Sequence, residues 1–173
     1  FQQMENEPLS AEMFQAEAII CNGLFLYNDL DNFPNLKFVQ LTSAGLDRVF
    51  VDRINEKGIK LCNARGVYSI PMAEWALTGV LSLYKNTKAF YENQKNHKWN
   101  KIRNIKELSG STVCIVGCGS VGTECAKLFK PFSSEIVAVD IVKPISDLFD
   151  SYYTINNVAK AVENADVVIL TLP

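Results

Sequence analysis

The chain has 173 residues, of which 48% are hydrophobic and 21% are charged, and its formal net charge at pH 7 is -2. This length allows one domain or two small ones, and the apolar content is sufficient for a packed core. The near-neutral charge argues against nucleic acid or an anionic membrane as a partner. No apolar run approaches the length of a membrane span, and no signal peptide is visible at the start.

Cysteine usage indicates a reduced, cytoplasmic protein. An odd number of cysteines without C-x-x-C pairs argues against a disulfide framework or a zinc site. Cys118 lies at a predicted helix start, where its thiol pKa could be lowered, although we favour a passive turn residue over a redox role. Cys21, Cys62 and Cys114 lie in apolar runs and are expected to be small core residues. The five cysteines are Cys21, Cys62, Cys114, Cys118 and Cys125.

The first part of the chain alternates between apolar runs and helical patterns. A short helix is expected within 24–35, capped by Asp29 or Asp31, and a longer helix over 46–57. The segment 43–45 should form a turn at the carboxyl end of a strand. Such alternation predicts a parallel sheet with helices on its faces. The predicted strands are residues 18–21, 36–42 and 59–62.

The longest helical pattern follows, with Pro71 in its first turn. Residues 73–84 are apolar on nearly every side, so we expect a helix buried by a neighbouring domain or a partner subunit. Glu74 is the exception. It is either a partnered carboxylate or a first-turn residue favoured by the helix dipole, and the sequence leaves both open.

Residues 85–106 are rich in lysine and contain three aromatic residues. A basic and aromatic nucleic-acid patch is one interpretation. An amphipathic helix followed by a solvated loop fits the overall charge better, and we favour it. The only histidine, His97, lies in this polar segment and is expected at the surface.

A short apolar run at 113–116 predicts a buried strand that leads into the spacing G-x-G-x-x-G. Gly117 allows a tight turn, and Gly119 lets the backbone approach a pyrophosphate closely. Gly122 allows the following helix, predicted over 123–130, to pack onto the sheet. The N–H groups at this helix start and its partial positive charge suit phosphates.

A second apolar run, 136–139, ends at Asp140, whose carboxylate would accept hydrogen bonds from ribose hydroxyl groups. Its negative charge would repel a 2′-phosphate, and Ile141 supplies no compensating arginine. The residues therefore favour NAD over NADP, with Lys143 as a weak indication of NADP. A structural glycine turn in another α/β sheet is the alternative.

Beyond Asp140 we expect a weak strand at 152–155, a helix capped by Asn156 and a strong buried strand over 166–173. The chain resembles the NAD-dependent D-isomer-specific 2-hydroxyacid dehydrogenases, which include phosphoglycerate, glycerate and D-lactate dehydrogenases. The order and spacing of the matching pieces cover nearly the whole chain. These pieces are 43–47, Asn63 with the later 73–74, 107–110 leading into 117–122, and 165–173.

The resemblance implies an α/β protein of two domains with an active site between them. Residues 1–70 would form part of a flavodoxin-like substrate domain. Residues 71–173 would form a hinge helix and an incomplete, doubly wound Rossmann-type domain that binds NAD. A homodimer is also expected, from family habit and from the apolar character of 73–84.

The resemblance also assigns site residues. Backbone N–H groups of the turn 42–45 would bind the substrate carboxylate, beyond the carboxyl end of a strand. Val67 and Tyr68 match substrate-loop positions, and Met72 would lie near the nicotinamide. The predicted substrate-binding residues are Ser43, Ala44, Gly45 and Tyr68. The predicted cofactor-binding residues are Met72, Gly117, Cys118, Gly119, Ser120, Val121, Gly122, Asp140, Ile141, Thr171, Leu172 and Pro173.

The family's catalytic arginine, acidic residue and histidine match no position in this sequence, and they are expected beyond residue 173. No arginine or histidine of the chain is assigned to these roles. We therefore expect a fragment of a longer polypeptide, which also lacks the family's usual first strand. The candidates set aside are Arg48, Arg53, Arg65, Arg103 and His97.

The favoured function is hydride transfer between NAD and C2 of a small 2-hydroxy or 2-oxo acid, with the cofactor supplying the hydride chemistry. A non-catalytic, NAD-sensing module resembling some transcriptional co-repressors is the alternative from another class. A third alternative is another Rossmann enzyme, of the adenosylhomocysteinase or alanine dehydrogenase kind. The 43–45 turn and the hinge-helix pattern argue against the third.

Overall fold

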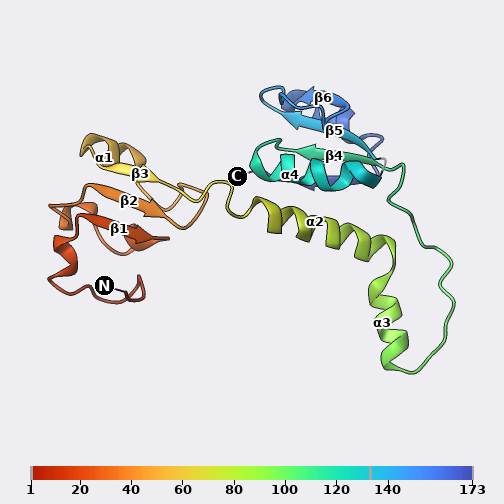
Figure 1. The fold of residues 1–173 in the computed structure, drawn as a ribbon, viewed down its shortest axis with the longest axis horizontal. Helices are drawn as coiled ribbons and strands as arrows, with labels where there is room; N and C mark the ends of the chain where they lie inside the picture. Colours follow the sequence, from red (N-terminus) through yellow and green to blue (C-terminus); the bar gives the residue numbers. More distant parts are fainter. Residues whose placement is uncertain (1, 133, 173) are drawn as a thin grey trace. The chain divides into compact units, whose positions relative to one another are not determined.

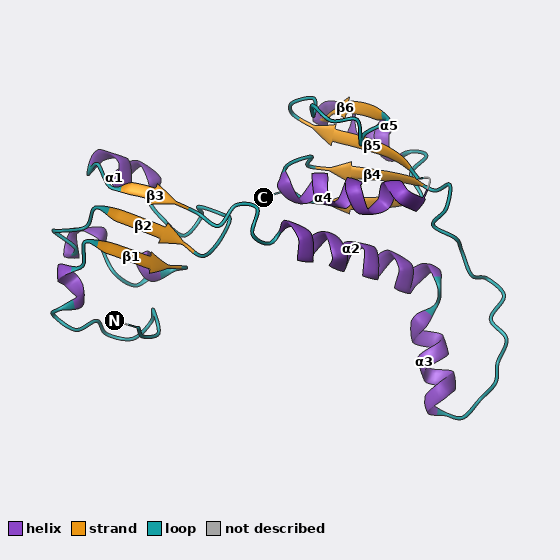
Figure 2. Ribbon diagram, in the orientation of Figure 1, coloured by secondary structure: helices purple, strands orange, loops and turns teal. Residues whose placement is uncertain are grey.

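The computed structural model describes residues 2–132 and 134–172, and it divides the chain into two compact units. The first unit ends at Tyr68 and the second begins at Ser69, two residues before the division expected from the sequence. Each unit contains a parallel sheet and helices (Figure 1, Figure 2). The α/β fold class expected from the sequence is therefore confirmed.

The first unit is built on three parallel strands in the order β1-β2-β3, where β1 is Ala18–Cys21, β2 is Phe38–Leu41 and β3 is Lys60–Cys62. Val39 of the central strand pairs with residues of both neighbours and is fully buried. Consecutive neighbours of this kind match the successive strands of a flavodoxin-like sheet. The remaining core residues come from the short helical turns, from α1 at Val51–Glu56, and from the connecting residues Phe33, Leu36 and Ile59. Cys62 of β3, predicted to be a core residue, is exposed.

Two helices predicted in this unit are shorter than expected. Residues 46–49 form a turn closed by the N–H of Val49 donating to the carbonyl of Leu46 at 3.2 Å, so α1 begins only at Val51. Asp29 is the cap that the structure uses, because its carboxylate accepts from the N–H of Asp31 at 2.9 Å. Before β2, the helical segments of this unit are single 3-10 turns, with the bounds Met13–Gln15, Leu24–Leu26 and Leu30–Asn32.

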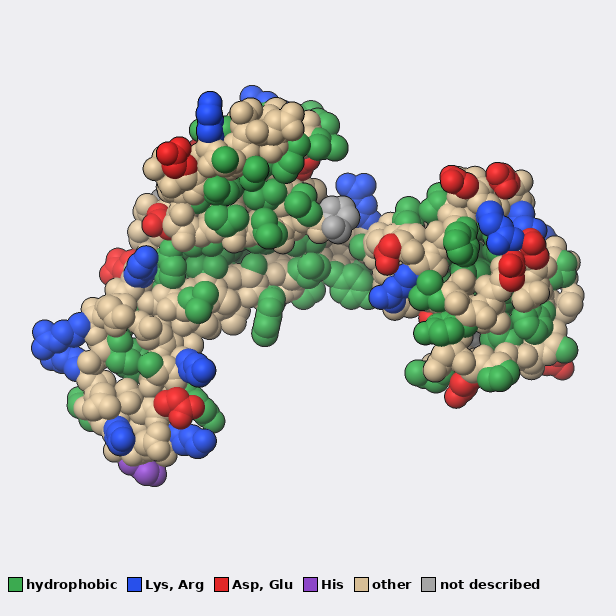
Figure 3. Space-filling model, turned by 180° about the vertical axis from the view of Figure 1, so that it is seen from behind, with side chains coloured by type: hydrophobic (Ala, Val, Ile, Leu, Met, Phe, Trp, Pro, Cys, Tyr) green, Lys and Arg blue, Asp and Glu red, His purple; other side chains and the backbone are tan. Residues whose placement is uncertain are grey.

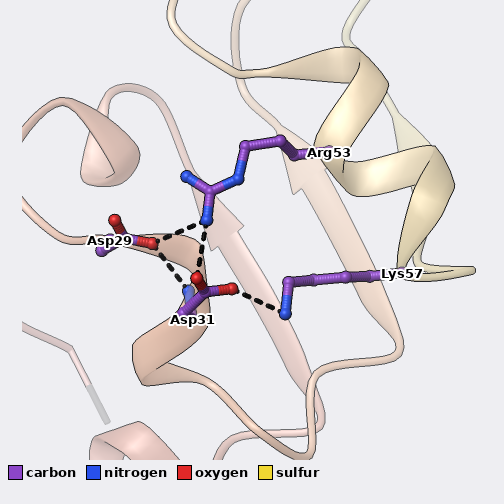
Figure 4. A network of polar contacts seen from close by, with 4 residues as sticks. All are labelled: Asp29, Asp31, Arg53 and Lys57. Atoms are coloured by element: carbon purple, nitrogen blue, oxygen red, sulfur yellow. Dashed lines mark hydrogen bonds and ion pairs between the residues drawn. The ribbon is translucent and has the colours of Figure 1, made fainter.

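A surface network joins α1 to the turn that Asp29 caps (Figure 4). The guanidinium of Arg53 bonds Asp29 at 3.1 Å and Asp31 at 2.8 Å, and the ammonium of Lys57 lies 2.7 Å from Asp31. The N–H of Asp31 and the cation of Arg53 together lower the pKa of Asp29. Arg53 therefore has a structural role, which agrees with leaving it out of the predicted site.

The second unit contains four parallel strands in the order β6-β5-β4-β7. In chain order this is 3-2-1-4, which is how a doubly wound sheet begins. The chain reverses direction across the sheet next to β4, and such a reversal is where these folds bind ligands. The strands are β4 at Thr112–Val116, β5 at Glu135–Asp140, β6 at Ser151–Thr154 and β7 at Val167–Leu170. The edge strand β7 was predicted to be buried, but Val168 and Leu170 on one of its faces are exposed.

Both faces of this sheet carry a hydrophobic core, because successive side chains of a strand point to opposite faces. Val113 and Ile115 pack with residues of α2 and α4, whereas Cys114 and Val116 pack with residues of α5. Helices α2 and α4 also contact each other. The helices of this unit are α2 at Ser69–Tyr84, α3 at Thr87–Lys95, α4 at Ser120–Phe129 and α5 at Val158–Val162.

Helix α2 is buried on one side only within the chain, so burial of its other sides, expected from a neighbouring domain or a partner subunit, stays a prediction. One side packs against α4, but Trp75 and Leu83 are each 78% exposed. Hydrophobic side chains are visible on the surface over this helix in Figure 3. Glu74 is exposed as well, so its carboxylate needs no buried partner.

Helix α3 has no buried residue, and the loop after it returns to the end of α2. The N–H of Lys106 donates to the carbonyl of Tyr84 at 3.1 Å, and the ammonium of Lys85 donates to the carbonyl of Lys106 at 2.8 Å. His97 is exposed, as predicted. The helix and solvated loop expected over 85–106 are therefore confirmed.

The predicted cap at Asn156 is wrong. A 3-10 turn covers Ile155–Asn157, and α5 begins only at Val158. The side chain of Asn157 donates to the hydroxyl of Thr154 at 3.1 Å and caps no helical N–H. Among the described helices, none is long and apolar enough to cross a membrane.

Candidate cofactor and substrate sites

The turn after β4, residues 117–122, has a backbone that only glycines allow at two positions. Gly117 has φ +95°, and a Cβ there would lie 2.9 Å from the carbonyl oxygen of Thr171. A Cβ on Gly122 would lie 2.1 Å from the carbonyl oxygen of Gly117. A Cβ on Gly119 would meet nothing within 4 Å, so the space beside this residue is open.

The carbonyl groups of the 117–122 turn are satisfied, as are the N–H groups of Gly117 and Cys118, whereas the N–H groups that follow are not. The hydroxyl of Thr171 donates to the carbonyl of Gly117 at 2.5 Å, and that of Thr123 donates to the carbonyl of Cys118 at 3.3 Å. The carbonyl of Gly119 accepts from the N–H of Thr123. Four successive N–H groups find no acceptor within residues 2–132 and 134–172. They belong to Gly119, Ser120, Val121 and Gly122.

Asp140 ends β5 beside this turn. One carboxylate oxygen accepts from the N–H of Cys118 at 2.6 Å, and the other accepts from the N–H of Ile141 at 2.6 Å. A carboxylate oxygen has more than one acceptor site, so both oxygens retain capacity for further hydrogen bonds. The side chain of Ile141 is exposed and adds no charge.

These features fit a dinucleotide. The open space at Gly119 and the free N–H groups at the start of α4 provide donors and a partial positive charge for a diphosphate. The carboxylate of Asp140 lies at the same end of the sheet, with acceptor sites for ribose hydroxyl groups. No side chain fills the space beside Gly119.

The expectation of a lowered thiol pKa at Cys118 is wrong. Burial raises the pKa of this thiol to about 11, and the negative charge of Asp140 adds to the shift. The sulfur lies 3.7 Å from the carbonyl oxygen of Ile115 and 3.8 Å from that of Val139. Cys118 is therefore a half-buried turn residue with a neutral thiol.

The remaining predicted cofactor residues are placed as follows. Thr171 lies against the 117–122 turn through its hydroxyl. Leu172 is largely exposed, with one methyl group 3.1 Å from where a Cβ of Gly117 would be. Met72 is exposed in the first turn of α2 and is not part of the core. Pro173 lies outside the described residues.

The turn 42–45 follows β2, the central strand of the first unit. The side-chain amide of Asn63 donates to the carbonyl of Ala44 at 2.7 Å, and the hydroxyl of Tyr68 donates to the carbonyl of Thr42 at 3.1 Å. Both donors belong to the loop after β3. The side chain of Tyr68, a predicted substrate-binding residue, thus contacts the backbone of the predicted turn.

The other carbonyls of the 42–45 turn are also satisfied. The N–H of Ala64 donates to the carbonyl of Ser43 at 2.9 Å, and the hydroxyl of Ser43 donates to the carbonyl of Gly45 at 3.0 Å. In contrast, no acceptor in the described part of the chain takes the N–H of Ser43, Ala44 or Gly45. The turn therefore offers donors and no free carbonyl.

Asn63 and Thr123, whose side chains donate to carbonyl groups of the two turns, were not predicted as site residues. Asn63 was noted only as a matching piece of the family pattern, and Thr123 only as a helix residue. The available signal for Asn63 was its place directly after β3, because the carboxyl ends of neighbouring parallel strands meet at one edge. Thr123 carried no signal beyond a hydroxyl in the first turn of a helix.

No group of side chains suited to hold a metal ion is found within the described residues. His97 and Arg103 lie after α3. Arg48 and Arg65 are exposed in loops of the first unit. None of the four bonds to either turn through its side chain within the described residues.

Comparisons with known proteins place the 117–122 turn in a family context. Residues 77–173 match the model of the D-isomer specific 2-hydroxyacid dehydrogenase, NAD binding domain. This segment contains the 117–122 turn and Asp140. A hydroxypyruvate reductase of Thermotoga maritima is 33% identical over 140 residues, which cover 80% of this chain and 45% of that protein.

Solved structures give the same result for the fold. A D-isomer specific 2-hydroxyacid dehydrogenase family protein from Aeromonas salmonicida superposes with a TM-score of 0.82 at 28% identity, covering 92% of this chain and 51% of that one. D-lactate dehydrogenase from Aquifex aeolicus, complexed with NAD and lactic acid, gives 0.80 at 23% identity, covering 95% and 51%. The chain spans about half the length of the relatives it matches.

Proposed function

Because the chain belongs to the D-isomer specific 2-hydroxyacid dehydrogenase family, we propose that its protein transfers a hydride between NAD and a small 2-hydroxy or 2-oxo acid. The observation that carries this proposal is the 117–122 turn, whose free N–H groups lie beside the carboxylate of Asp140. Both lie at the carboxyl ends of neighbouring parallel strands, where such sheets bind nucleotides.

In this proposal, the N–H groups from Gly119 to Gly122 donate to the diphosphate of NAD. Asp140 accepts from the adenosine ribose, and Thr171 and Leu172 line the adenosine pocket, with Met72 toward the nicotinamide. Ile141 leaves the charge of Asp140 uncompensated, which disfavours a 2′-phosphate. When bound, NAD supplies the hydride acceptor or donor for C2 of the acid.

We further propose that the unit ending at Tyr68 holds the substrate. The free N–H groups of Ser43, Ala44 and Gly45 are suited to a carboxylate, which accepts charge-assisted hydrogen bonds from backbone donors. The residues of this turn orient the acid and leave its C2 free to react. Proton exchange is not assigned to His97, because this histidine is exposed after α3.

A second copy of the chain is the partner proposed for α2 and α3. Trp75 and Leu83 of α2 are largely exposed, and Trp99, after α3, is 99% exposed. Large apolar side chains at this density are characteristic of surfaces that are covered in an assembly. Sedimentation velocity of the wild-type chain and of Trp75→Ala tests the dimer, which the variant should weaken.

We also propose a cytoplasmic location and no nucleic-acid partner. All five cysteines are free thiols, which suits a reducing compartment. The lysine-rich segment 85–106 is balanced by acidic residues elsewhere, giving the net charge of -2. Fluorescence microscopy of the tagged protein tests the location. A gel-shift assay with nucleic acid tests the absence of such a partner.

The proposed cofactor site is tested by calorimetric titration of NAD and NADP into the wild-type chain and Asp140→Ala. Loss of hydrogen bonds to a charged acceptor should weaken NAD binding by roughly 10- to 100-fold. NADP should lose less, because the repulsion of its 2′-phosphate is removed. Equal NAD affinity for the wild-type chain and the variant would contradict the assignment.

A further inference from the structure

We propose that Asn63 and Tyr68 are positioning residues, which hold the 42–45 turn so that its N–H groups face a carboxylate substrate. This inference rests on the proposed function, because it takes the turn as the acid-binding site. Tyr68 then acts through the backbone of the turn, whereas its match to a substrate-loop position suggested direct contact with the acid.

The role of Tyr68 follows from the number of hydrogens on its hydroxyl. A phenol has one O–H donor, and this hydrogen is directed to the carbonyl oxygen of Thr42 at 3.1 Å. While that bond is present, Tyr68 cannot donate to the carboxylate of a substrate. Its hydroxyl oxygen can only accept, which does not suit an anion.

Asn63 is fixed at both ends of its side-chain amide. The NH₂ group donates to the carbonyl of Ala44 at 2.7 Å, while the oxygen lies 3.4 Å from the N–H of Arg65. Only the NH₂ group can serve a carbonyl acceptor, so the orientation of the amide is determined by its partners. The same residue therefore links its own loop to the neighbouring turn.

The consequence for the 42–45 turn is a fixed polarity. Peptide units present either a carbonyl or an N–H to a given side, and a free carbonyl near the site would repel a carboxylate. With its carbonyls engaged by donors from Asn63, Ala64, Tyr68 and Ser43, the backbone of the turn presents only N–H groups as free polar atoms. The carboxylate of Asp47, outside the turn, lies beside Gly45. The donors for an acid are thus oriented before it binds, which reduces the cost of ordering them.

The experiment is an NMR titration of the full chain with oxamate, an unreactive analogue of a 2-oxo acid, at saturating NAD. Amide signals of residues 43–45 report binding in the wild-type chain, Tyr68→Phe, Asn63→Ala and the control Tyr27→Phe. Tyr27 is an exposed tyrosine of the same unit. Each single variant should weaken oxamate binding roughly fivefold, because the N–H donors of the turn are then less well ordered before the acid binds. The control should match the wild-type chain.

Two further readouts separate positioning from general structural damage. NAD affinity should stay at the wild-type value in Tyr68→Phe, and the thermal midpoint should fall by no more than the loss of one exposed hydrogen bond explains. The signals of residues 43–45 should shift or broaden in that variant before oxamate is added, because the turn has lost one support.

The outcomes distinguish the inference from the function on which it rests. Unchanged oxamate affinity in both variants, with the signals of residues 43–45 still responding, would overturn the positioning role and leave the acid site intact. A wild-type chain whose signals at 43–45 ignore oxamate would overturn both. Parallel losses of NAD affinity and thermal midpoint would show a structural role only, and would also overturn the inference.

Discussion

The two turns at the ends of β2 and β4 reach the same result by different means. In 42–45 and in 117–122 alike, carbonyl groups accept hydrogen bonds from within the chain and successive N–H groups remain free. In 117–122 the path of the backbone depends on Gly117 and Gly122, whose missing Cβ atoms permit a close approach. In 42–45 it depends on side chains from a neighbouring loop.

This difference decides which turn can be recognised from sequence. The glycine spacing of 117–122 is local, and the requirement for each glycine follows from covalent geometry. The supports of 42–45 come from far along the chain: Asn63 is 19 residues from Ala44, and Tyr68 is 26 residues from Thr42. Nothing in the residues of a short turn indicates which distant side chains will reach it.

The same distinction explains the successes and failures of the fold prediction. The strands β4 and β5 were placed from apolar runs alone, because a buried parallel strand needs no other signal. The exposure of Trp75 and Leu83 on α2 within the chain could not be predicted, since an apolar helix face is buried only where a neighbour covers it. The start of α1 at Val51 was likewise set by the turn before it.

The largest expected effect breaks the glycine-dependent turn. In Gly122→Ala the added Cβ would lie 2.1 Å from the carbonyl oxygen of Gly117, so the turn must move. We expect a loss of stability of about 1–3 kcal/mol from overpacking, together with loss of measurable NAD binding. Chemical denaturation and NAD titration measure the two effects.

The matched variant is Gly119→Ala, where an added Cβ meets nothing within 4 Å. It should retain nearly the wild-type free energy of unfolding while weakening NAD binding, because the methyl group enters the space proposed for the diphosphate. Equal destabilisation by both substitutions would contradict the difference in space around the two glycines, one close to backbone atoms and the other open.

A smaller effect is expected where a side chain supports the glycine turn. Thr171→Val removes the hydroxyl that donates to the carbonyl of Gly117 while keeping a similar volume. The free energy of unfolding should fall by about 1 kcal/mol, the usual contribution of one hydrogen bond. A variant as stable as the wild-type chain would mean that glycine geometry alone holds 117–122.

A pH-dependent effect extends the comparison to a carboxylate that supports the backbone of the second unit. Asp150 accepts from the N–H of Ile136 at 2.7 Å and pairs with Lys130, and these contacts lower its pKa from the usual 3.8. A carboxylate with a lowered pKa in the folded state stabilises the fold at every pH above its usual pKa. This stabilisation is lost as the pH falls through the lowered pKa.

Asp150→Asn should therefore unfold at a lower temperature than the wild-type chain at neutral pH. The difference between the two should begin to shrink as the pH falls below the usual 3.8, and it should be lost as the pH falls through the lowered pKa of the folded wild-type carboxylate. Thermal unfolding followed by circular dichroism over a pH series measures it. A difference independent of pH would assign the effect to packing.

The smallest effect is expected at the surface network of the first unit. Arg53→Gln removes two ion pairs to exposed aspartates, which salt screens and water solvates. The thermal midpoint should fall by less than about 2 °C, and added salt should reduce the difference. A large, salt-independent fall would indicate that Arg53 holds the helix α1 in place.

The most direct test of the cofactor site is an amide NMR titration of the chain with NAD. The N–H groups of Gly119, Ser120, Val121 and Gly122 should show the largest shifts, accompanied by those near Asp140. These are the free donors of the 117–122 turn and the carboxylate beside it. Saturable NAD binding that leaves these signals unmoved would contradict the proposed site.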